Sequence, residues 1–243
     1  MAKKAALGSS FLIDGYDLSG DIREVNLRRP SGILDVTAIS ASAVERIHSH
    51  VDGEMSIVSF FNDATGRQHL TLRAKGSDAD RIAVFLHQST IGNMAAGLVA
   101  KQINYDPARA ADGSLVAAVQ CLANNYGLDY CEQLTAGLRT DTGATNGASQ
   151  DNAGATALGL AAYLIVTSFT GTSVTVTIQE SSDDGGGDAF AAVTGGAFAA
   201  ASAVGAQRIV TSVQAVERYL RAVTTGTFNP ATFAVIVTRY PQR

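Results

Sequence analysis

The chain has 243 residues and a formal net charge of −4, a length that suits one large domain or two of ordinary size. Its charge argues against a nucleic-acid-binding protein held by bulk electrostatics, because such proteins normally carry a basic excess. Charged residues make up 16% of the chain, well below the ~25% of an average soluble domain. With no Trp, four His and 24 Gly, the chain has few side chains that could do chemistry.

The N-terminal residues MAKKAALGSS do not predict a secretory signal, since they lack the apolar core of ~7–15 residues that such a signal needs. The most apolar window, residues 157–167, is too short for a membrane span of ~20 residues and favours a buried strand. Cys121 and Cys131 match no CxxC pairing, and two lone cysteines are more often free thiols than a disulfide framework. We therefore expect a soluble protein, made in a reducing cytoplasm and without a membrane partner.

A polar stretch divides the chain. Residues 141–156 contain no apolar side chain larger than alanine, so they cannot bury enough surface to order themselves. All four lysines precede this stretch and none follows it. The sequence therefore predicts two domains, residues 1–140 and 157–243, joined by a flexible linker.

Strands dominate the prediction for the first domain. Residues 10–29 hold short apolar pieces broken at Gly-bearing turns, the first of them at residues 14–15. Residues 94–107 and 113–124 are predicted as two antiparallel strands, joined through a Gly-bearing turn at residues 112–113.

A further strand is predicted over residues 67–76. Leu70 and Leu72 lie on one face of this segment and polar side chains on the other, which is the alternation of a half-buried strand. Residues 54–61 alternate more loosely and end at a polar turn.

One helix is predicted, near residues 78–88. Ser77 or Asp78 can cap its first turn. Apolar side chains then recur three and four residues apart, as on one face of a helix, at Ile82, Phe85 and Leu86. The first domain is therefore α+β, with one helix beside the strands.

The second domain is predicted to be all-β. Residues 172–181 and 232–240 alternate apolar and polar side chains. Turns are expected at residues 170–172, 183–187, 195–196 and 229–230. Short strands with frequent turns are typical of a small antiparallel β-sandwich. The fold class of the whole chain is accordingly mainly β.

A metal site is conceivable at His48 and His50, because Asp52 and Glu54 continue the same alternation along a strand. Nothing else in the chain supplies a second ligand set with diagnostic spacing. A solvated strand face is the favoured interpretation, and we predict no metal.

Residues 181–188, SSDDGGGD, have the composition of a calcium loop. They lack the spaced ligands and the terminal Glu that an EF-hand needs to complete the coordination sphere. The tip of a β-hairpin is the favoured interpretation.

The densest basic cluster consists of Arg23, Arg28 and Arg29. A solvated edge or a salt bridge between subunits is favoured there over a phosphate site. The chain has no GxGxxG, GxxxxGK[ST] or GxSxG motif and no spacing that links a nucleophile to a base. We therefore predict no catalytic residue, no cofactor and no enzymatic activity.

With so few charges, the surface must consist largely of Thr, Ser, Ala, Gln and Asn. Such a surface loses little desolvation energy or side-chain entropy when a neighbour covers it. Strand edges also pair readily with another chain unless they are blocked. These properties favour a protein that assembles with copies of itself.

Two parts of the chain resemble known phage proteins. Residues 15–39, 78–89 and 105–147 are similar to major tail tube proteins of long-tailed, non-contractile bacteriophages. Residues 163–186 and 195–228 resemble a small β-sandwich module that is often appended to phage virion proteins. Together these segments cover most of the chain.

The resemblance implies a structural virion protein of the phage tail, made in the host bacterial cytoplasm. In that family a β-barrel-like domain with a flanking helix forms hexameric rings, and stacked rings enclose the channel through which DNA passes. Residues 31–53 would then be the loop between rings, and residues 53–61 and 94–105 would be candidates for the inner wall. Other tail proteins, such as the tape measure and the tail terminator, would be partners.

Two alternatives remain open at this point. A capsid decoration or cement protein would have the same module and composition. A glycan-binding adhesin is a weaker alternative, because sugar sites usually present aromatic faces. The second domain offers only the scattered Tyr163, Tyr219 and Tyr240 for that purpose.

Overall fold

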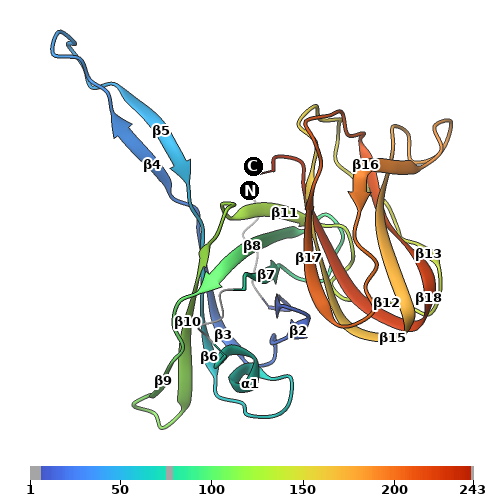
Figure 1. Ribbon diagram of the computed structural model, residues 1–243, viewed down its shortest axis with the longest axis horizontal. Coiled ribbons are helices and arrows are strands. Elements are labelled where there is room, and N and C mark those ends of the chain that lie inside the picture. Colours follow the sequence, from blue (N-terminus) through green and yellow to red (C-terminus); the bar gives the residue numbers. More distant parts are fainter. Residues whose placement is uncertain (1–6, 75–78, 242–243) are drawn as a thin grey trace.

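The computed structural model describes residues 7–74 and 79–241, and β-strands dominate both ranges (Figure 1). The predicted mainly-β class is confirmed. Most strands belong to one extended antiparallel sheet, in which the strand order is β16-β15-β18-β11-β8-β10-β6-β3. This path has two open ends, so the sheet does not close into the expected barrel.

The N-terminal half contains one short helix, α1 (Gln68–Leu72), among its strands. The strands are β1 (Ser10–Ile13), β2 (Tyr16–Asp17), β3 (Ile22–Arg28), β4 (Ser31–Asp35), β5 (Arg46–Val51), β6 (Glu54–Phe60), β7 (Arg81–Leu86), β8 (Met94–Gln102), β9 (Asp106–Arg109), β10 (Leu115–Ala123) and β11 (Asp129–Gln133). Strands β1, β7 and β8 pack across a buried apolar core from β6 and β10, and Leu72 of α1 is part of that core.

The C-terminal half is built on two long strands. They are β15 (Ala161–Ser181) and β18 (Tyr219–Thr238), which pair along almost their whole length. Shorter strands pair with one or the other: β12 (Arg139–Asp141), β13 (Thr145–Asn146) and β14 (Gln150–Asp151) with β18, and β16 (Ala191–Ala197) and β17 (Gly205–Val210) with β15. Alternate residues of β15 and β18 fill the apolar core of this half.

A third core joins the two halves. Tyr163 and Ile165 of β15 pack there against apolar side chains of β1, β7, β8 and β11, while Leu164 and Val166 face the C-terminal core. Both faces of this part of β15 are therefore buried, which confirms the strand predicted from the apolar window 157–167. The halves are also joined by hydrogen-bonded pairing, because Glu132 of β11 stands opposite Val237 of β18.

The helix predicted near residues 78–88 is wrong, since Arg81–Leu86 form β7, between β1 and β8. One face of β7 contributes Ala83 to the N-terminal core, and the other contributes Val84 and Leu86 to the core between the halves. A strand that is apolar on both faces produces the same spacing as one helical face. The predicted caps, residues 77–78, lie outside the described residues.

The strand predicted over residues 67–76 is also wrong. Gln68–Leu72 form a single helical turn, in which the amide of Thr71 donates to the carbonyl of Arg67. Leu72 is fully buried and Leu70 only partly so. Two leucines two residues apart fit a short helix as well as a strand, so their spacing alone was not diagnostic.

The flexible linker predicted at residues 141–156 requires correction as well. Within it, β13 and β14 pair with β18, and the amide of Gly147 donates to the carbonyl of Ala222. Backbone hydrogen bonds hold this stretch on the C-terminal sheet, although it has no large apolar side chains.

Three of the four turns predicted in the C-terminal half lie inside strands. Residues 170–172 belong to β15, 195–196 to β16 and 229–230 to β18. At Gly171 the strand register shifts, and a Cβ would lie 2.5 Å from the Cα of Phe228. Glycine here allows two strands to approach closely at a bulge rather than forming a turn.

Other predictions are confirmed. Asp14 and Gly15, both with positive φ, form the turn between β1 and β2. Strands β8 and β10 are antiparallel, although β9 intervenes and forms the hairpin with β10. Cys121 and Cys131 are free and buried.

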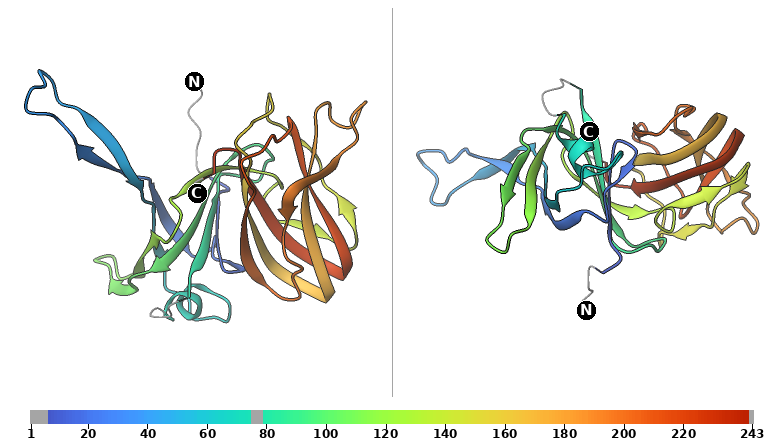
Figure 2. Two further views of the ribbon diagram at one scale, coloured as in Figure 1. Left: turned by 45° about the horizontal axis from the view of Figure 1, so that its top comes forward. Right: turned by 90° about the horizontal axis from the view of Figure 1, so that it is seen from below.

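Strands β4 and β5 form a separate two-stranded sheet that projects from the molecule (Figures 1 and 2). We call this hairpin, residues 31–51, the arm. It continues the pairing of β3 with β6, so the four strands make one long hairpin whose outer half leaves the main sheet.

Candidate functional site

The arm has one apolar face and one polar face. Leu34 stands directly opposite Ile47, and by strand alternation Val36 shares their face. The other face carries Ile33 together with the polar side chains of Asp35, Arg46 and His48. Leu34 and Ile47 are 53% and 52% exposed, so none of the described residues covers the apolar face.

The base of the arm is tightly held. Arg28 forms an ion pair with Glu54 at 3.2 Å, and the amide of Asp52 donates to the carbonyl of Pro30 at 3.0 Å. A Cβ on Gly53 would collide with the backbone of Leu128. The direction in which the arm leaves the sheet therefore depends on the segment that contains Leu128.

That segment, residues 126–129, connects β10 to β11 and also contacts the C-terminal half. The guanidinium of Arg208 in β17 lies 3.8 Å from the ring centroid of Tyr126. The same guanidinium donates to the carboxylate of Asp129 at 3.0 Å and to the hydroxyl oxygen of Tyr163 at 3.0 Å. We call residues 126–129 the junction.

The polar network at the junction is almost fully buried. The side chains of Arg208 and Asp129 are 5% and 0% exposed. Burial, together with the charge of Asp129, raises the pKa of Tyr163, so its hydroxyl stays protonated and donates to the Asp129 carboxylate at 2.7 Å. Each charge and donor in the network therefore has a partner inside the protein, as buried charges require.

The sheet formed by β3, β6 and β10 has one open face, which mixes polar side chains with apolar ones such as Val58 and Phe60. Ser56 of β6 stands opposite both Asn26 and Gln120, and this face forms a hollow of about 320 Å³. The Gln120 amide donates to Glu54 at 2.7 Å, and the Asn26 amide donates to Glu24 at 2.9 Å. The surface thus offers amides and carboxylates that already have hydrogen-bond partners.

Of the two candidate wall segments, only residues 53–61 have an open face. Strand β8, within residues 94–105, is buried on both sides from Ala95 to Ala100. Its neighbours within the same chain cover it, so these residues cannot line a channel. The exposure of a strand depends on which other strands pack on it, and alternation in the sequence does not reveal these neighbours.

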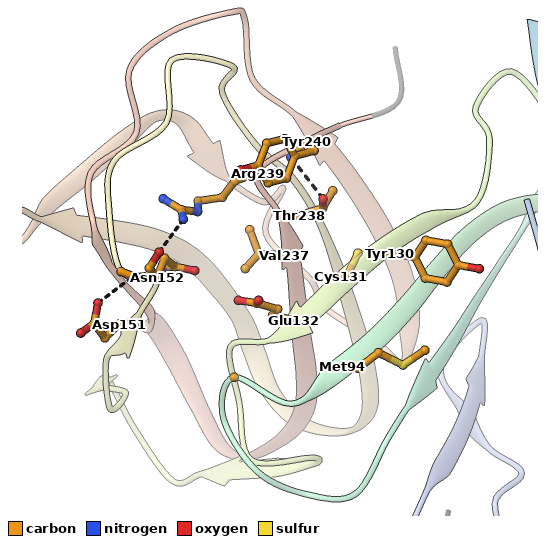
Figure 3. Close-up of a pocket in the computed structure, with 12 residues that line it drawn as sticks. Met94, Tyr130, Cys131, Glu132, Asp151, Asn152, Val237, Thr238, Arg239 and Tyr240 are labelled. Carbon is orange, nitrogen blue, oxygen red and sulfur yellow. Dashed lines mark hydrogen bonds between the residues drawn. The ribbon is translucent and has the colours of Figure 1, made fainter. Parts of the chain in front are cut away.

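A cleft of about 530 Å³ opens where β11 and the end of β18 diverge (Figure 3). Met94 and Tyr130 lie on one side of it, and Arg239 and Tyr240 on another (Figure 3). The guanidinium of Arg239 donates to the carbonyl oxygens of residues 152 and 154. The cleft therefore draws on both halves of the chain.

The four residues of the conceivable metal site do not converge. His48 and His50 lie on the arm, whereas Asp52 caps the amide of Gly53 and Glu54 pairs with Arg28. Across residues 7–74 and 79–241, no group of three or more His, Cys, Asp or Glu side chains is placed to hold a metal ion.

The other singled-out residues have local roles. Residues 181–188 connect β15 to β16 as a hairpin tip, where the Asp183 carboxylate accepts from the amides of Gly186 and Asp188. The backbone hydrogen bond from Gly187, followed by those from Asp188 and Gly186, lowers the pKa of Asp183. Tyr163 is completely buried, so it cannot present a face to a sugar.

The basic cluster lies on strand β3 and just beyond it. Arg28 is paired with Glu54, while Arg23 and Glu24 line a hollow of about 200 Å³ beside β1. Strand β3 pairs only with β6 and is one end of the sheet, which places the cluster at an edge as predicted. No helix among the described residues is long and apolar enough to cross a membrane.

Sequence reasoning missed the junction and the cleft. Arg208 lies far from Tyr126 and Asp129 in the chain, and no spacing in the sequence connects it to them, so no sequence signal could have identified the junction.

No family model and no curated protein matches the chain. Several solved structures overlap it. One is a chain from the virion of a native gene transfer agent particle, with 12% identity and a TM-score of 0.41 over 53% of this chain and 98% of that one. Another comes from the tail of an empty gene transfer agent particle with C6 symmetry, with 14% identity and a TM-score of 0.36 over 49% and 94%.

The third is the SPP1 Dit protein (gp 19.1), described as a hub of the adsorption apparatus in phages that infect Gram-positive hosts. It has 13% identity and a TM-score of 0.35 over 95% of this chain and 99% of that one. Identities and TM-scores at this level do not define a family for the chain.

Proposed function

We propose that the chain is a non-enzymatic structural protein of a phage tail, and that its copies form hexameric rings that stack into the tail tube through which DNA passes. The observation that carries this proposal is the uncovered apolar face of the arm. The six-fold ring and the tail location rest on the resemblance of residues 15–147 to tail tube proteins.

In an isolated chain, the exposed apolar face of the arm is energetically unfavourable. A lone two-stranded hairpin is marginally stable in water, and this one exposes Leu34, Val36 and Ile47 together. Fully burying an aliphatic side chain of this size contributes about 1.5–3 kcal/mol. A neighbouring copy that covers this face would bury the exposed half of each of these three side chains and gain roughly half of that energy at each, so the arm would bridge subunits in successive rings.

Open sheet edges would support the same assembly. Strands β3 and β16 end the main sheet, and each leaves one edge that no described strand covers. Such edges pair with another strand unless charge, proline or a bulge prevents it. Within a ring, β3 of one copy would lie beside the next copy, with the exposed Arg23 and Arg29 placed for salt bridges between subunits.

The open face of β3, β6 and β10 would line the channel. Its carboxylates, Glu24 and Glu54, are hydrogen-bonded, and its arginine, Arg28, is paired with Glu54. A wall of this kind gives phosphates little to bind, so DNA would pass without counterion release and without being held. The tape measure and tail terminator would be further partners, and a membrane would not.

Sedimentation velocity over a range of concentrations tests the proposal. The wild-type chain is expected to form large species, and the variant Leu34→Glu with Ile47→Glu is expected to remain monomeric with unchanged circular dichroism. Ile33→Glu, on the polar face of the arm, is the matched control and is expected to assemble. A wild-type chain that stays monomeric throughout, or a double variant that assembles normally, would contradict the proposal.

A further inference from the structure

We infer that the C-terminal half acts as a brace for the arm, through the junction: Arg208 holds residues 126–129, and these residues fix the direction of the arm. The inference gives residues 157–243 a mechanical role inside each subunit. It goes beyond the proposed function, because it concerns one copy of the chain and holds whether or not copies assemble.

The junction contacts the arm at its base. A Cβ on Gly127 would lie 2.9 Å from Cγ1 of Val51, and a Cβ on Gly53 would lie 2.9 Å from Cβ of Leu128. The carbonyl of Gly53 also accepts a hydrogen bond from Ala123 at 2.8 Å, just before the junction. The arm cannot move toward the junction unless the junction also moves, because the two backbones are close-packed and leave no space between them.

The C-terminal half contacts the same four residues from the other side. Arg208 lies over the ring of Tyr126 at 3.8 Å and pairs with Asp129 at 3.0 Å. Tyr163, which stands directly opposite Arg208 in the pairing of β15 with β17, holds the second contact to Asp129. The two ends of the junction are thus held by the C-terminal half, and its two middle residues hold the arm.

The junction network is more rigid than the arm. Asp129 and Arg208 are buried charges, so moving either away from the other would leave an unpaired charge in an apolar setting, which is strongly unfavourable. The network is therefore stiff, whereas the arm itself has few contacts and no core. A rigid junction restricts the angle between the arm and the C-terminal sheet. A subunit needs this restriction if its arm is to contact a neighbour at a fixed angle.

Tyr126 is the best position for a test, because it is only partly buried and its variants should fold. Tyr126→Ala removes the ring beneath Arg208, and Tyr126→Phe keeps that ring. Arg208→Met removes the charge but keeps the bulk of the side chain. Val176→Ala is the matched control, since Val176 is fully buried in the C-terminal core and is not part of the junction.

The measurement is the distance distribution between spin labels at Ile39→Cys, on the arm tip, and Val213→Cys, on the C-terminal half, by pulsed electron paramagnetic resonance. Both positions are exposed, whereas the native cysteines are buried. Labelled copies are diluted into unlabelled ones, so that the distance is measured within one chain in any state of assembly.

Tyr126→Ala and Arg208→Met are each expected to broaden the distribution at least twofold, while Tyr126→Phe and Val176→Ala keep the wild-type width. Wild-type widths for both Tyr126→Ala and Arg208→Met would overturn the inference and leave the proposed function intact. Equal broadening by Val176→Ala would also overturn it, because general loss of stability would then be the cause.

Discussion

The ring of Tyr163 packs directly on the backbone of Gly97, so closely that a Cβ on residue 97 would lie 2.5 Å from Cε2 of the tyrosine. Gly97 lies in β8 of the N-terminal half, and Tyr163 lies in β15 of the C-terminal half. The two halves therefore meet at a position where a side chain has no room.

Gly97→Ala is expected to destabilise the protein by about 1–3 kcal/mol, because overpacking a buried contact forces neighbouring atoms to shift. Chemical denaturation measures the change. Gly143→Ala is the control, since nothing lies within 4 Å of its added Cβ, and it should leave stability nearly unchanged. Equal effects of the two variants would show that contact with Tyr163 is not the cause.

The buried ion pair gives a second, graded prediction. Asp129→Asn should cost about 3–5 kcal/mol of unfolding free energy, because it leaves the charge of Arg208 buried without its counter-charge. Tyr163→Phe should cost less, about 2 kcal/mol, since it removes two hydrogen bonds, one to Asp129 and one from Arg208, and keeps the ion pair. Urea denaturation of both variants checks the order, and a larger loss for Tyr163→Phe would contradict this account of the network.

The two thiols are expected to be unreactive in the folded protein. Burial raises the pKa of Cys121 to about 11, and burial together with the charge of Asp129 raises the pKa of Cys131. Only the thiolate reacts with thiol reagents. Titration with a disulfide reagent at pH 8 should detect no thiol in the native state and both after denaturation; prompt reaction of either in the native protein would contradict the burial described here.

Acid should weaken the contact between β14 and β18. A hydrogen bond from Arg218 lowers the pKa of Asp151 to about 2, from its usual value of 3.8. Because the folded-state pKa is the lower one, this pair stabilises the fold above pH ~4 and the contribution disappears as the pH falls toward ~2. The pair is exposed, so added salt should reduce the effect.

The pH dependence is measured by comparing the wild-type chain with Asp151→Asn between pH 5 and pH 2. The difference in stability between them should shrink as the pH falls. A difference that stays constant over this range would show that the carboxylate is not stabilised by Arg218.

Alternation in the sequence predicted those strands that have one core face. Val174, Val176 and Ile178 point into the C-terminal core, and the polar residues between them point away. The same reasoning failed at β7, where Val84 and Ala83 both face apolar cores on opposite sides. The alternation of apolar and polar side chains disappears when both faces of a strand are buried. The sequence does not show that β7 is such a strand, because its second core comes from a distant part of the chain.

Glycine in the sequence does not distinguish a turn from a bulge. The sequence predicts turns at Gly171 and Gly195, which have positive φ, but both residues lie inside strands. The backbone conformation that glycine permits serves a bulge as well as a turn. The junction had no local signal at all, since Tyr126 and Arg208 are brought together only by the packing of β15 on the N-terminal half.

The arm itself was found by resemblance, but its amphipathic character follows from register. Leu34 and Ile47 share a face only because these two residues pair across the hairpin. A shift by one residue would have placed Leu34 beside polar side chains. Register depends on the turn at the arm tip, which composition does not specify.

Negative-stain electron microscopy of the concentrated, purified protein is the most direct test of whether the chain self-associates. We expect six-fold rings and stacked tubes with an open channel, and we expect both to be lost when the apolar face of the arm carries Leu34→Glu and Ile47→Glu. Fields of single, separate particles at every concentration, with the wild-type protein fully folded, would contradict self-association.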